Sequence, residues 1–338
     1  MEKKRVLVTG GAGFIGSELV RQLATQNFRV TAVDNLTNGN RENLDGVLGP
    51  DVDLVVADIR NESAIIPLLR EAEVLFHLAC LGIRHSIQAP VENHDVNASA
   101  TLSLLEKARE MGIKRFVYVS SSEVYGKART APITEEHPTL PTTVYGASKL
   151  AGECYTRAFW QTYRFPTVVV RPFNAYGPRS HHEGDGGEVI PKFMLRCLLG
   201  EPMMVFGDGR QTRDFTFVSD TARGILAAGF SEATVGETFN LGGGTEIRIN
   251  DLAITIADVL GKNGAAINHV ESRPGDVLRL LADSSKASKL LDFEPTVSLK
   301  DGLAQLRDWY TSQGRSPLEF LENRVVRNWK PRGVASHV

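Results

Sequence analysis

The sequence predicts an α/β protein with a doubly wound parallel sheet and a smaller C-terminal α/β domain. Short apolar runs alternate with longer amphipathic stretches through the first half of the 338-residue chain, which is the order of elements in such sheets. The apolar runs also lack polar alternation. We therefore expect both faces of these strands to be buried beneath helices.

Six strands and five helices are predicted in chain order. The strands cover 6–8, 29–33, 54–57, 74–79, 115–120 and 167–170, and the helices cover about 16–24, 97–111, 145–163, 250–260 and 299–311. Glycine and proline become frequent after Arg171, which indicates loops and short elements. We expect one domain over 1–172, completed by parts of 214–245, and a second mainly over 173–338.

Composition excludes several classes of partner. The formal net charge is −2, so broad electrostatic binding to nucleic acid or to an acidic membrane is not expected. The three cysteines are an odd number and lie far apart, which argues against a disulfide framework. The N-terminus does not resemble a signal peptide, and no apolar run reaches the ~18 to 20 residues of a membrane span. A cytoplasmic protein is expected.

A glycine-rich segment follows the first strand and opens the first helix. Gly11, Gly13 and Gly16 satisfy the pattern G-x-G-x-x-G, which permits a tight turn and close approach of the backbone to a pyrophosphate. The helix N-terminus adds amide donors and partial positive charge. Asp34 ends the second strand, where a carboxylate can bind both adenosine ribose hydroxyls and would repel a 2′-phosphate. The segment therefore predicts a Rossmann-type site for NAD rather than NADP.

Tyr145 and Lys149 are four residues apart at the start of a predicted helix, so they share one face. A tyrosine is a poor base at neutral pH, but a nearby ammonium group and the positive nicotinamide ring of NAD both favour the phenolate. We therefore expect Lys149 and bound NAD together to lower the pKa of Tyr145. Ser121 follows the fifth strand, where its hydroxyl can bond the oxygen that becomes a carbonyl.

Several segments occur in the order of one known family. They are 9–16, Asp34-Asn35-Leu36, 120–126, Tyr145-x-x-x-Lys149 and 171–174. Together the chain resembles the extended short-chain dehydrogenase/reductases, the sugar-nucleotide epimerase/dehydratase family. The resemblance implies a catalytic triad of Ser121, Tyr145 and Lys149 and a tightly held NAD that is recycled in each turnover. It also implies a homodimer through the helices near 97–111 and 145–163.

The predicted site falls into three groups of residues. The predicted catalytic residues are Ser121, Ser122, Glu123, Tyr145 and Lys149. The predicted NAD-binding residues are Gly10, Gly13, Phe14, Ile15, Gly16, Asp34, Asn35, Asp58, Ile59, Ala79, Asn97, Tyr145 and Lys149. The predicted residues for a nucleotide-diphosphate sugar are Asn174, Val189, Val205, Arg213, Arg273 and Asp276. In this set the two arginines resemble family residues that contact the diphosphate, as guanidinium groups do.

No metal site is expected. His181 and His182 are adjacent, but no acidic or cysteine partner has the spacing of a metal ligand. A pair of loop histidines is the simpler interpretation.

The reaction depends on Glu123. Once carbon 4 of a sugar is a ketone, the carbon 5 proton is acidic, and a carboxylate here could remove it and eliminate water from carbon 6. The family's 4,6-dehydratases carry glutamate at this place, although Ser122 stands where some of them have an aspartate acid. We therefore favour a dehydratase. A UDP-hexose or UDP-hexuronate 4-epimerase stays the alternative, because the segment around Arg213 resembles epimerases.

Two further readings stay open. UDP-glucuronate decarboxylases also carry Ser-Glu here but use an arginine in the region of Ser285. Some relatives keep the fold only as NAD-binding sensors, and these tend to lose the tyrosine and lysine.

Overall fold

A parallel sheet forms the centre of the computed structural model, which describes residues 3–182, 187–272 and 277–321. The strand order is β11-β6-β5-β4-β1-β2-β3, with every neighbouring pair parallel. The direction of winding reverses between β1 and β4, where doubly wound sheets bind their ligands. The strands are β1 (Arg5–Thr9), β2 (Arg29–Asp34), β3 (Val52–Val56), β4 (Val74–His77), β5 (Arg115–Val119), β6 (Thr167–Pro172) and β11 (Thr238–Leu241).

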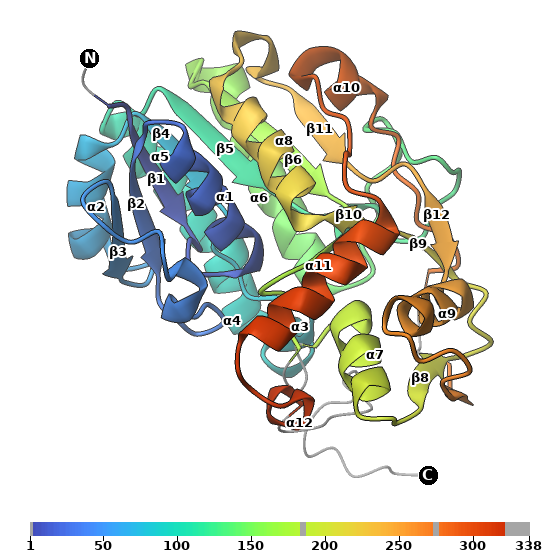
Figure 1. Cartoon of the computed structure of the whole chain (residues 1–338). Helices are drawn as coiled ribbons and strands as arrows, with labels where there is room; N and C mark the ends of the chain where they lie inside the picture. Colours follow the sequence, from blue (N-terminus) through green and yellow to red (C-terminus); the bar gives the residue numbers. More distant parts are fainter. Residues whose placement is uncertain (1–2, 183–186, 273–276, 322–338) are drawn as a thin grey trace.

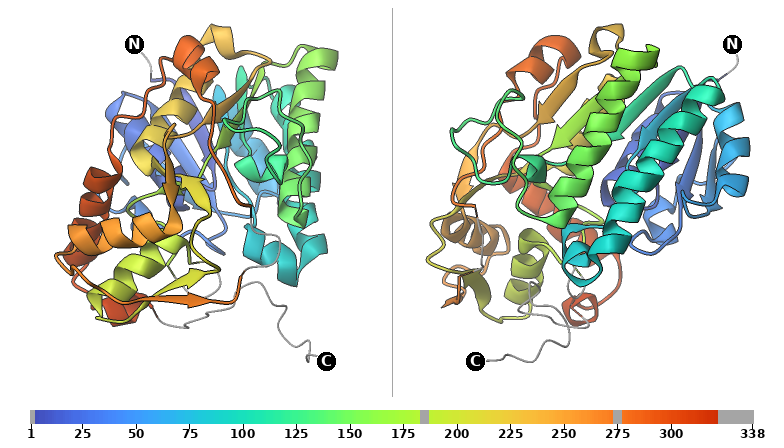
Figure 2. Two further views of the ribbon diagram at one scale, coloured as in Figure 1. Left: turned by 90° about the vertical axis from the view of Figure 1, so that its right-hand side faces the viewer. Right: turned by 180° about the vertical axis from the view of Figure 1, so that it is seen from behind.

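Helices cover both faces of this sheet (Figures 1 and 2). One face carries α1 (Phe14–Thr25), α8 (Val218–Phe230) and α10 (Ser285–Leu291), and the other carries α2 (Glu62–Glu71), α5 (Ala100–Glu110) and α6 (Val144–Tyr163). Leu75 and Phe76 are neighbours on β4, and they belong to the two opposite cores. The continuous apolar strands are therefore explained by burial on both sides.

A second, smaller region packs beside the carboxyl-terminal edge of the sheet and has its own apolar core. Its three strand pairs are β7 (Ala175–Tyr176) with β10 (Thr216–Phe217), β9 (Thr212–Asp214) with β12 (Glu246–Arg248), and β8 (Met203–Phe206) with β13 (Ile267–Val270). Its helices are α7 (Val189–Leu198), α9 (Ile249–Val259), α11 (Leu299–Ser312) and α12 (Pro317–Phe320). The predicted fold class is confirmed.

The remaining short helices connect the main elements. They are α3 (Ile83–Gln88), α4 (Pro90–His94), the π-helical turn η2 (Asp95–Ser99), and the 3₁₀ turns η1 (Arg41–Leu44), η3 (Ser122–Tyr125) and η4 (Glu232–Thr234). The helix predicted over 97–111 is thus a π turn followed by α5. Three helices of ten or more residues were not predicted: α2, which contains Pro67, α7, and α8, which is rich in alanine and glycine.

A buried ion pair joins α6 to β6. Arg171 donates to Glu153 from Nε at 2.8 Å and from Nη2 at 2.6 Å, and both side chains are almost wholly buried. Arg171 also donates from Nη1 to the Tyr125 hydroxyl at 2.7 Å, which donates to Asn240 Oδ1 at 2.6 Å. Burial acts to raise the pKa of Glu153, but the Arg171 guanidinium outweighs it and holds that pKa below its ordinary value.

We predict that Glu153→Gln strongly destabilises the protein. The change leaves the buried Arg171 cation without its carboxylate, and breaking such a pair from one side costs about 3 to 5 kcal/mol. Chemical denaturation would measure the free energy of unfolding. The matched control is Glu73→Gln, because Glu73 pairs with Lys114 at 2.7 Å on the surface. That variant should lose less than about 1 kcal/mol, and equal losses in the two variants would contradict the assignment.

Candidate active site

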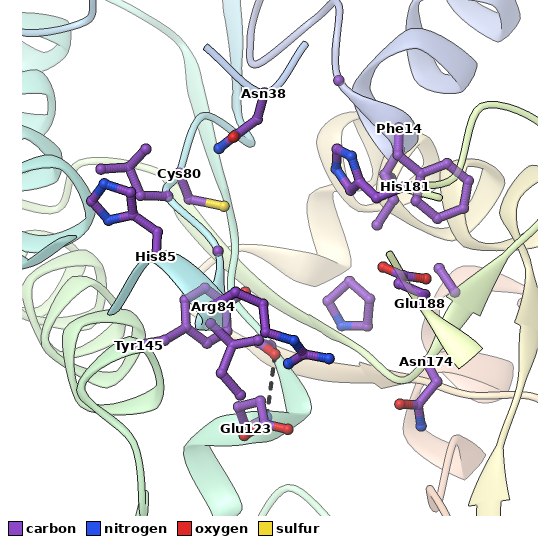
Figure 3. A pocket seen from close by; sticks show the side chains of 18 of the residues that line it. Phe14, Asn38, Cys80, Arg84, His85, Glu123, Tyr145, Asn174, His181 and Glu188 are labelled. Carbon is purple, nitrogen blue, oxygen red and sulfur yellow. Dashed lines mark hydrogen bonds between the residues drawn. The ribbon is translucent and has the colours of Figure 1, made fainter. Parts of the chain in front are cut away.

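A cavity of about 910 Å³ lies between the carboxyl-terminal edge of the large sheet and the second region. Figure 3 shows side chains from both regions pointing into it. The predicted catalytic residues Ser121, Ser122, Glu123, Tyr145 and Lys149 all line it. So do Asn174, Val189 and Arg213, and every predicted NAD-binding residue except Asn97. Segments far apart in the sequence therefore meet here. Arg273 and Asp276 lie outside the described residues.

The glycine turn has the shape that a dinucleotide pyrophosphate requires. A Cβ atom at Gly16 would lie 2.0 Å from the Gly10 carbonyl oxygen, so only glycine allows this packing of helix against turn. The Gly10 amide donates to the Val33 oxygen at 2.7 Å, which fixes the turn on β2. In the described structure no side chain caps α1 at Gly13, and Phe14 and Ile15 line the cavity. The amides at this helix end can therefore face a phosphate.

Asp34 does more than end β2. Its Oδ2 accepts from the Ala12 amide at 3.0 Å and its Oδ1 accepts from the Leu36 amide at 2.9 Å. Burial raises the pKa of the Asp34 carboxyl, and these backbone hydrogen bonds oppose the rise. The carboxylate thus ties the glycine turn to the end of β2 while it also lines the cavity. A ribose diol would meet an acceptor that is already oriented.

Asp58 is held as an anion at the neighbouring strand end. Arg60 donates to it from Nε at 2.9 Å and from Nη2 at 2.8 Å, and Asn35 donates to it from Nδ2 at 3.1 Å. The side-chain hydrogen bonds from Arg60 lower the pKa of Asp58 to about 2. Asp58 and Asn35 were identified from the sequence, but Arg60 was missed. Arg60 follows Asp58 by two residues, and that spacing could have indicated the pair.

Asn97 is fully buried and does not line the cavity. Its Oδ1 accepts from the Leu81 amide at 2.8 Å, and its Nδ2 donates to the Leu81 oxygen at 2.9 Å. It thereby fixes the segment after β4, which carries Ala79 and Leu81 into the cavity wall. Asn97 therefore positions this wall of the cavity. It was predicted to bind NAD directly, and the structure does not place it where it could.

The short turn η3 and the start of the long helix α6 bring the candidate catalytic side chains together. Ser121 caps η3 by accepting from the Glu123 amide at 3.2 Å (dashed in Figure 3), and Thr143 caps α6 by accepting from the Gly146 amide at 3.0 Å. A Cβ atom at Gly146 would lie 2.7 Å from the Glu123 carbonyl oxygen. The start of α6 can therefore approach η3 closely enough to place Tyr145 beside Glu123 and Ser121.

Lys149 lies beneath Tyr145, one helical turn along α6. Its Nζ donates to the Val119 oxygen at 2.8 Å and sits 5.1 Å from the centre of the Tyr118 ring. The side chain is 2% exposed. A cation with a single backbone acceptor and two remaining N–H donors can also bind a ribose hydroxyl in the cavity.

Within the protein itself, the pKa of Tyr145 is raised well above its ordinary value, so Lys149 alone does not lower it. Burial is the main cause, and the Cys80 thiol and the carboxylates of Glu123 and Glu188 add to it, while the neighbouring Ser121 hydroxyl opposes it. Lys149 does not reverse this balance. A nearby positive charge from a bound cofactor would favour the phenolate.

The opposite wall is built by the second region. Asn174 donates from Nδ2 to the Asp214 oxygen at 3.2 Å, and Arg213 donates from Nη1 to the oxygens of Thr212 and Val277, each at 2.7 Å. Both side chains line the cavity beside Val189. These anchors orient an amide and a guanidinium toward the same space, as recognition of a diphosphate requires.

Val205 is misplaced by the sequence prediction. It is fully buried in the core of the second region and does not line the cavity. Its neighbours on β8, Met204 and Phe206, line the cavity instead, because successive side chains of a strand point to opposite faces.

Several cavity residues were missed. Arg84 and His85 come from α3, and Glu188 and Lys192 come from the first turn of α7. His181 lines the cavity, whereas His182 packs its ring against Tyr310 and Phe320, with ring centres 5.9 and 5.1 Å away. The one signal in the sequence was Glu188, a charged residue directly before the apolar helix α7.

The described residues contain neither a membrane-spanning helix nor a cluster of metal ligands. Within 3–182, 187–272 and 277–321, no helix is both long and apolar enough to cross a bilayer. Over the same ranges, no three histidine, cysteine or acidic side chains cluster as metal ligands.

Comparison with known proteins gives a consistent family. The family model of GDP-mannose 4,6-dehydratase matches residues 7–306. The UDP-glucose 4-epimerase of Mycolicibacterium smegmatis is 35% identical over 92% of this chain and 100% of its own. The dTDP-glucose 4,6-dehydratase of an Actinoplanes species is 36% identical over 90% of this chain and 97% of its own. The dTDP-glucose 4,6-dehydratase DesIV of Streptomyces venezuelae, solved with NAD bound, superposes with a TM-score of 0.84 at 34% identity, covering 91% and 97% of the two chains.

We predict that Asp34→Asn weakens NAD binding about tenfold or more and narrows the preference over NADP. The asparagine amide has one acceptor oxygen where two backbone donors converge, and it no longer repels a 2′-phosphate. Loss of one charge-assisted hydrogen bond corresponds to roughly a tenfold loss of affinity. Calorimetric titration of nucleotide-free protein would measure both dissociation constants. Asp53→Asn, at an exposed position of β3, is the control. Unchanged affinities in Asp34→Asn would contradict the role given to Asp34.

Proposed function

The chain belongs to the extended short-chain dehydrogenase/reductase family of sugar-nucleotide epimerases and dehydratases, and from this membership we propose that it is a nucleotide-sugar 4,6-dehydratase. At the coarser level it is an NAD-dependent nucleotide-sugar epimerase or dehydratase. In the proposal, 1–172 together with parts of 214–245 hold NAD. The rest of the chain holds the nucleotide sugar, with Arg213 at the diphosphate.

The observation that carries the proposal is the position of Glu123. Its carboxylate lines the cavity and is close enough to Tyr145 to raise the pKa of that phenol. Epimerisation at carbon 4 needs only a hydride transfer and a hydroxyl proton transfer, which Tyr145 and the cofactor account for. A second base beside the tyrosine has a use when a carbon-bound proton must also be removed.

The proposed sequence of steps balances without any outside reactant. Tyr145 takes the proton of the carbon 4 hydroxyl while Ser121 bonds that oxygen and Lys149 holds the cofactor ribose. The role of NAD is to accept the carbon 4 hydride and later return it to the sugar. Glu123 takes the carbon 5 proton of the 4-keto sugar and passes it to the carbon 6 hydroxyl, which leaves as water, while Tyr145 keeps the proton that later returns to carbon 5. Return of the hydride to carbon 6 and of a proton to carbon 5 gives a 4-keto-6-deoxy sugar.

A 4-epimerase is the second candidate. Ser122 stands between Ser121 and Glu123 on the cavity wall, and its hydroxyl is a much weaker acid than a carboxyl for protonating a leaving group. The sequence identities of the epimerase and dehydratase relatives are nearly the same, and the solved epimerases are slightly more similar in structure, which favours this second candidate. A decarboxylase is less supported, because Ser285, at the start of α10, does not line the cavity.

We also propose a homodimer through α5 and α6. The two helices lie together on the outer face of the sheet (Figure 2), and Leu102 of α5 and Tyr163 of α6 are 39% and 53% exposed. Arg109 stacks on the Tyr163 ring at 4.7 Å, which joins the two helices near their C-terminal ends. An apolar surface shared by two helices fits a symmetric partner.

Incubation with UDP-, dTDP- and GDP-hexoses in deuterated water tests the reaction. We expect one hexose to give a product lighter by one water, with one deuterium on carbon 5, by mass spectrometry and proton NMR. An isomer of unchanged mass and without deuterium would establish the epimerase instead.

We predict that Glu123→Gln lowers the dehydration rate by about a hundredfold or more, the range for loss of a positioned base. Reduced cofactor should then accumulate, because carbon 4 oxidation still proceeds and elimination does not. Absorbance at the reduced nicotinamide band would follow it. The control is Glu136→Gln, which removes a carboxylate at an exposed position outside the cavity lining. Full activity of Glu123→Gln would remove the base assignment.

We predict that Tyr145→Phe abolishes turnover by about a hundredfold or more while NAD stays bound. Because the pKa of Tyr145 is raised, its phenolate is scarce at neutral pH, so kcat/KM of the wild type should increase as the pH rises. Steady-state rates over a pH series, with calorimetry for NAD, check both points. Persistent activity in the variant would overturn the triad.

A further inference from the structure

Two carboxylates face the cavity from opposite walls. Glu123 comes from η3 beside Tyr145, and Glu188 comes from the start of α7, on the side of Asn174 and His181 (Figure 3). The proposed reaction uses Glu123 and leaves Glu188 without a part. A buried carboxylate is costly unless something compensates it, so its presence calls for a physical reason.

Glu188 is fixed by its backbone and not by its carboxylate. Its amide donates to the His181 oxygen at 2.9 Å, and its carbonyl accepts from the Lys192 amide at 3.1 Å. Within the described part of the chain, the carboxylate itself accepts no hydrogen bond. Burial raises the pKa of Glu188 to about 7, and the positive charge of Arg84 opposes that rise. Arg84 is therefore a cation whose charge acts on Glu188 across the cavity.

Arg84 reaches the cavity from the other side. It belongs to α3, after the loop that follows β4, and its guanidinium points from the side of Tyr145 toward the middle of the cavity (Figure 3). A guanidinium in that place is a natural ligand for a carboxylate. On the α7 and β9 side, Lys192 and Arg213 line the cavity, and there we place the diphosphate.

We propose that Glu188 stands opposite Arg84 in the place of a substrate carboxylate, so that the cavity selects neutral hexoses and rejects hexuronates. With Glu188 ionised, a sugar carboxylate would enter beside both Glu188 and Glu123, and the positive charge of Arg84 would already act on Glu188. Like charges brought together in a partly buried site cost several kcal/mol. The inference rests on the proposed function only in that a nucleotide sugar is bound, and it holds for a dehydratase or an epimerase.

The test compares the glucose and glucuronate esters of one nucleoside diphosphate, whichever of UDP, dTDP and GDP binds the wild type most tightly. Calorimetric titration of the NAD-loaded protein at pH 8.5, where Glu188 is ionised, gives the two dissociation constants. We expect the wild type to bind the glucose ester more tightly. Glu188→Gln should shift the ratio toward the glucuronate ester by about tenfold or more.

Two further variants make the result specific. Arg84→Gln combined with Glu188→Gln should cancel most of the shift, because the glucuronate then lacks its cation. Glu294→Gln, on the exposed loop after α10, removes a carboxylate elsewhere and should leave the ratio unchanged. A wild type that prefers glucuronate, a ratio unmoved by Glu188→Gln, or a shift that survives loss of Arg84 would each overturn the proposal. Failure of the deuterium experiment would leave these binding ratios untouched.

Discussion

The buried contact of Glu153 with Arg171 is the interaction on which the rest of the site depends. Glu153 is one helical turn beyond Lys149 on α6, and Arg171 is at the end of β6. Through the Tyr125 hydroxyl the same guanidinium reaches η3, the turn that carries Glu123. A charge pair sealed from water has few alternative arrangements. The helix with the candidate acid–base tyrosine and the turn with the candidate second base are therefore held in one frame.

Within this frame, burial at the cavity disfavours the charged forms of Tyr145 and Glu188. Burial raises the pKa values of both Tyr145 and Glu188, while Asp58, beside Arg60 at the rim, keeps a pKa of about 2. The rim is thus polar and permanently charged, whereas the interior changes protonation with its contents. A charged rim with a titratable interior suits the oxidation of an alcohol, in which the hydroxyl loses a proton and its carbon loses a hydride.

Local patterns identified residues that the structure brings to one cavity wall. Gly16 and Asp34 follow from the spacing of a strand, a turn and a helix, and Tyr145 with Lys149 follows from helical geometry. Val205 was wrong because the phase of a short strand, inward or outward, cannot be read from three or four residues. Arg84 and Glu188 were missed because they meet only through tertiary packing of α3 and α7, and neither belongs to a local pattern. The direction of the Tyr145 pKa shift likewise depends on burial, which a sequence does not display.

The close approach of Gly146 to the Glu123 carbonyl has a consequence for how this scaffold can diversify. Since no side chain fits between them, the loop of residue 123 and the first turn of α6 are in direct backbone contact. Natural variation cannot retune the spacing of the two groups gradually. It can exchange the side chain at 123 on an unchanged backbone, so new reactions in this scaffold would arise through discrete replacements at that position, with oxidation at the tyrosine conserved throughout.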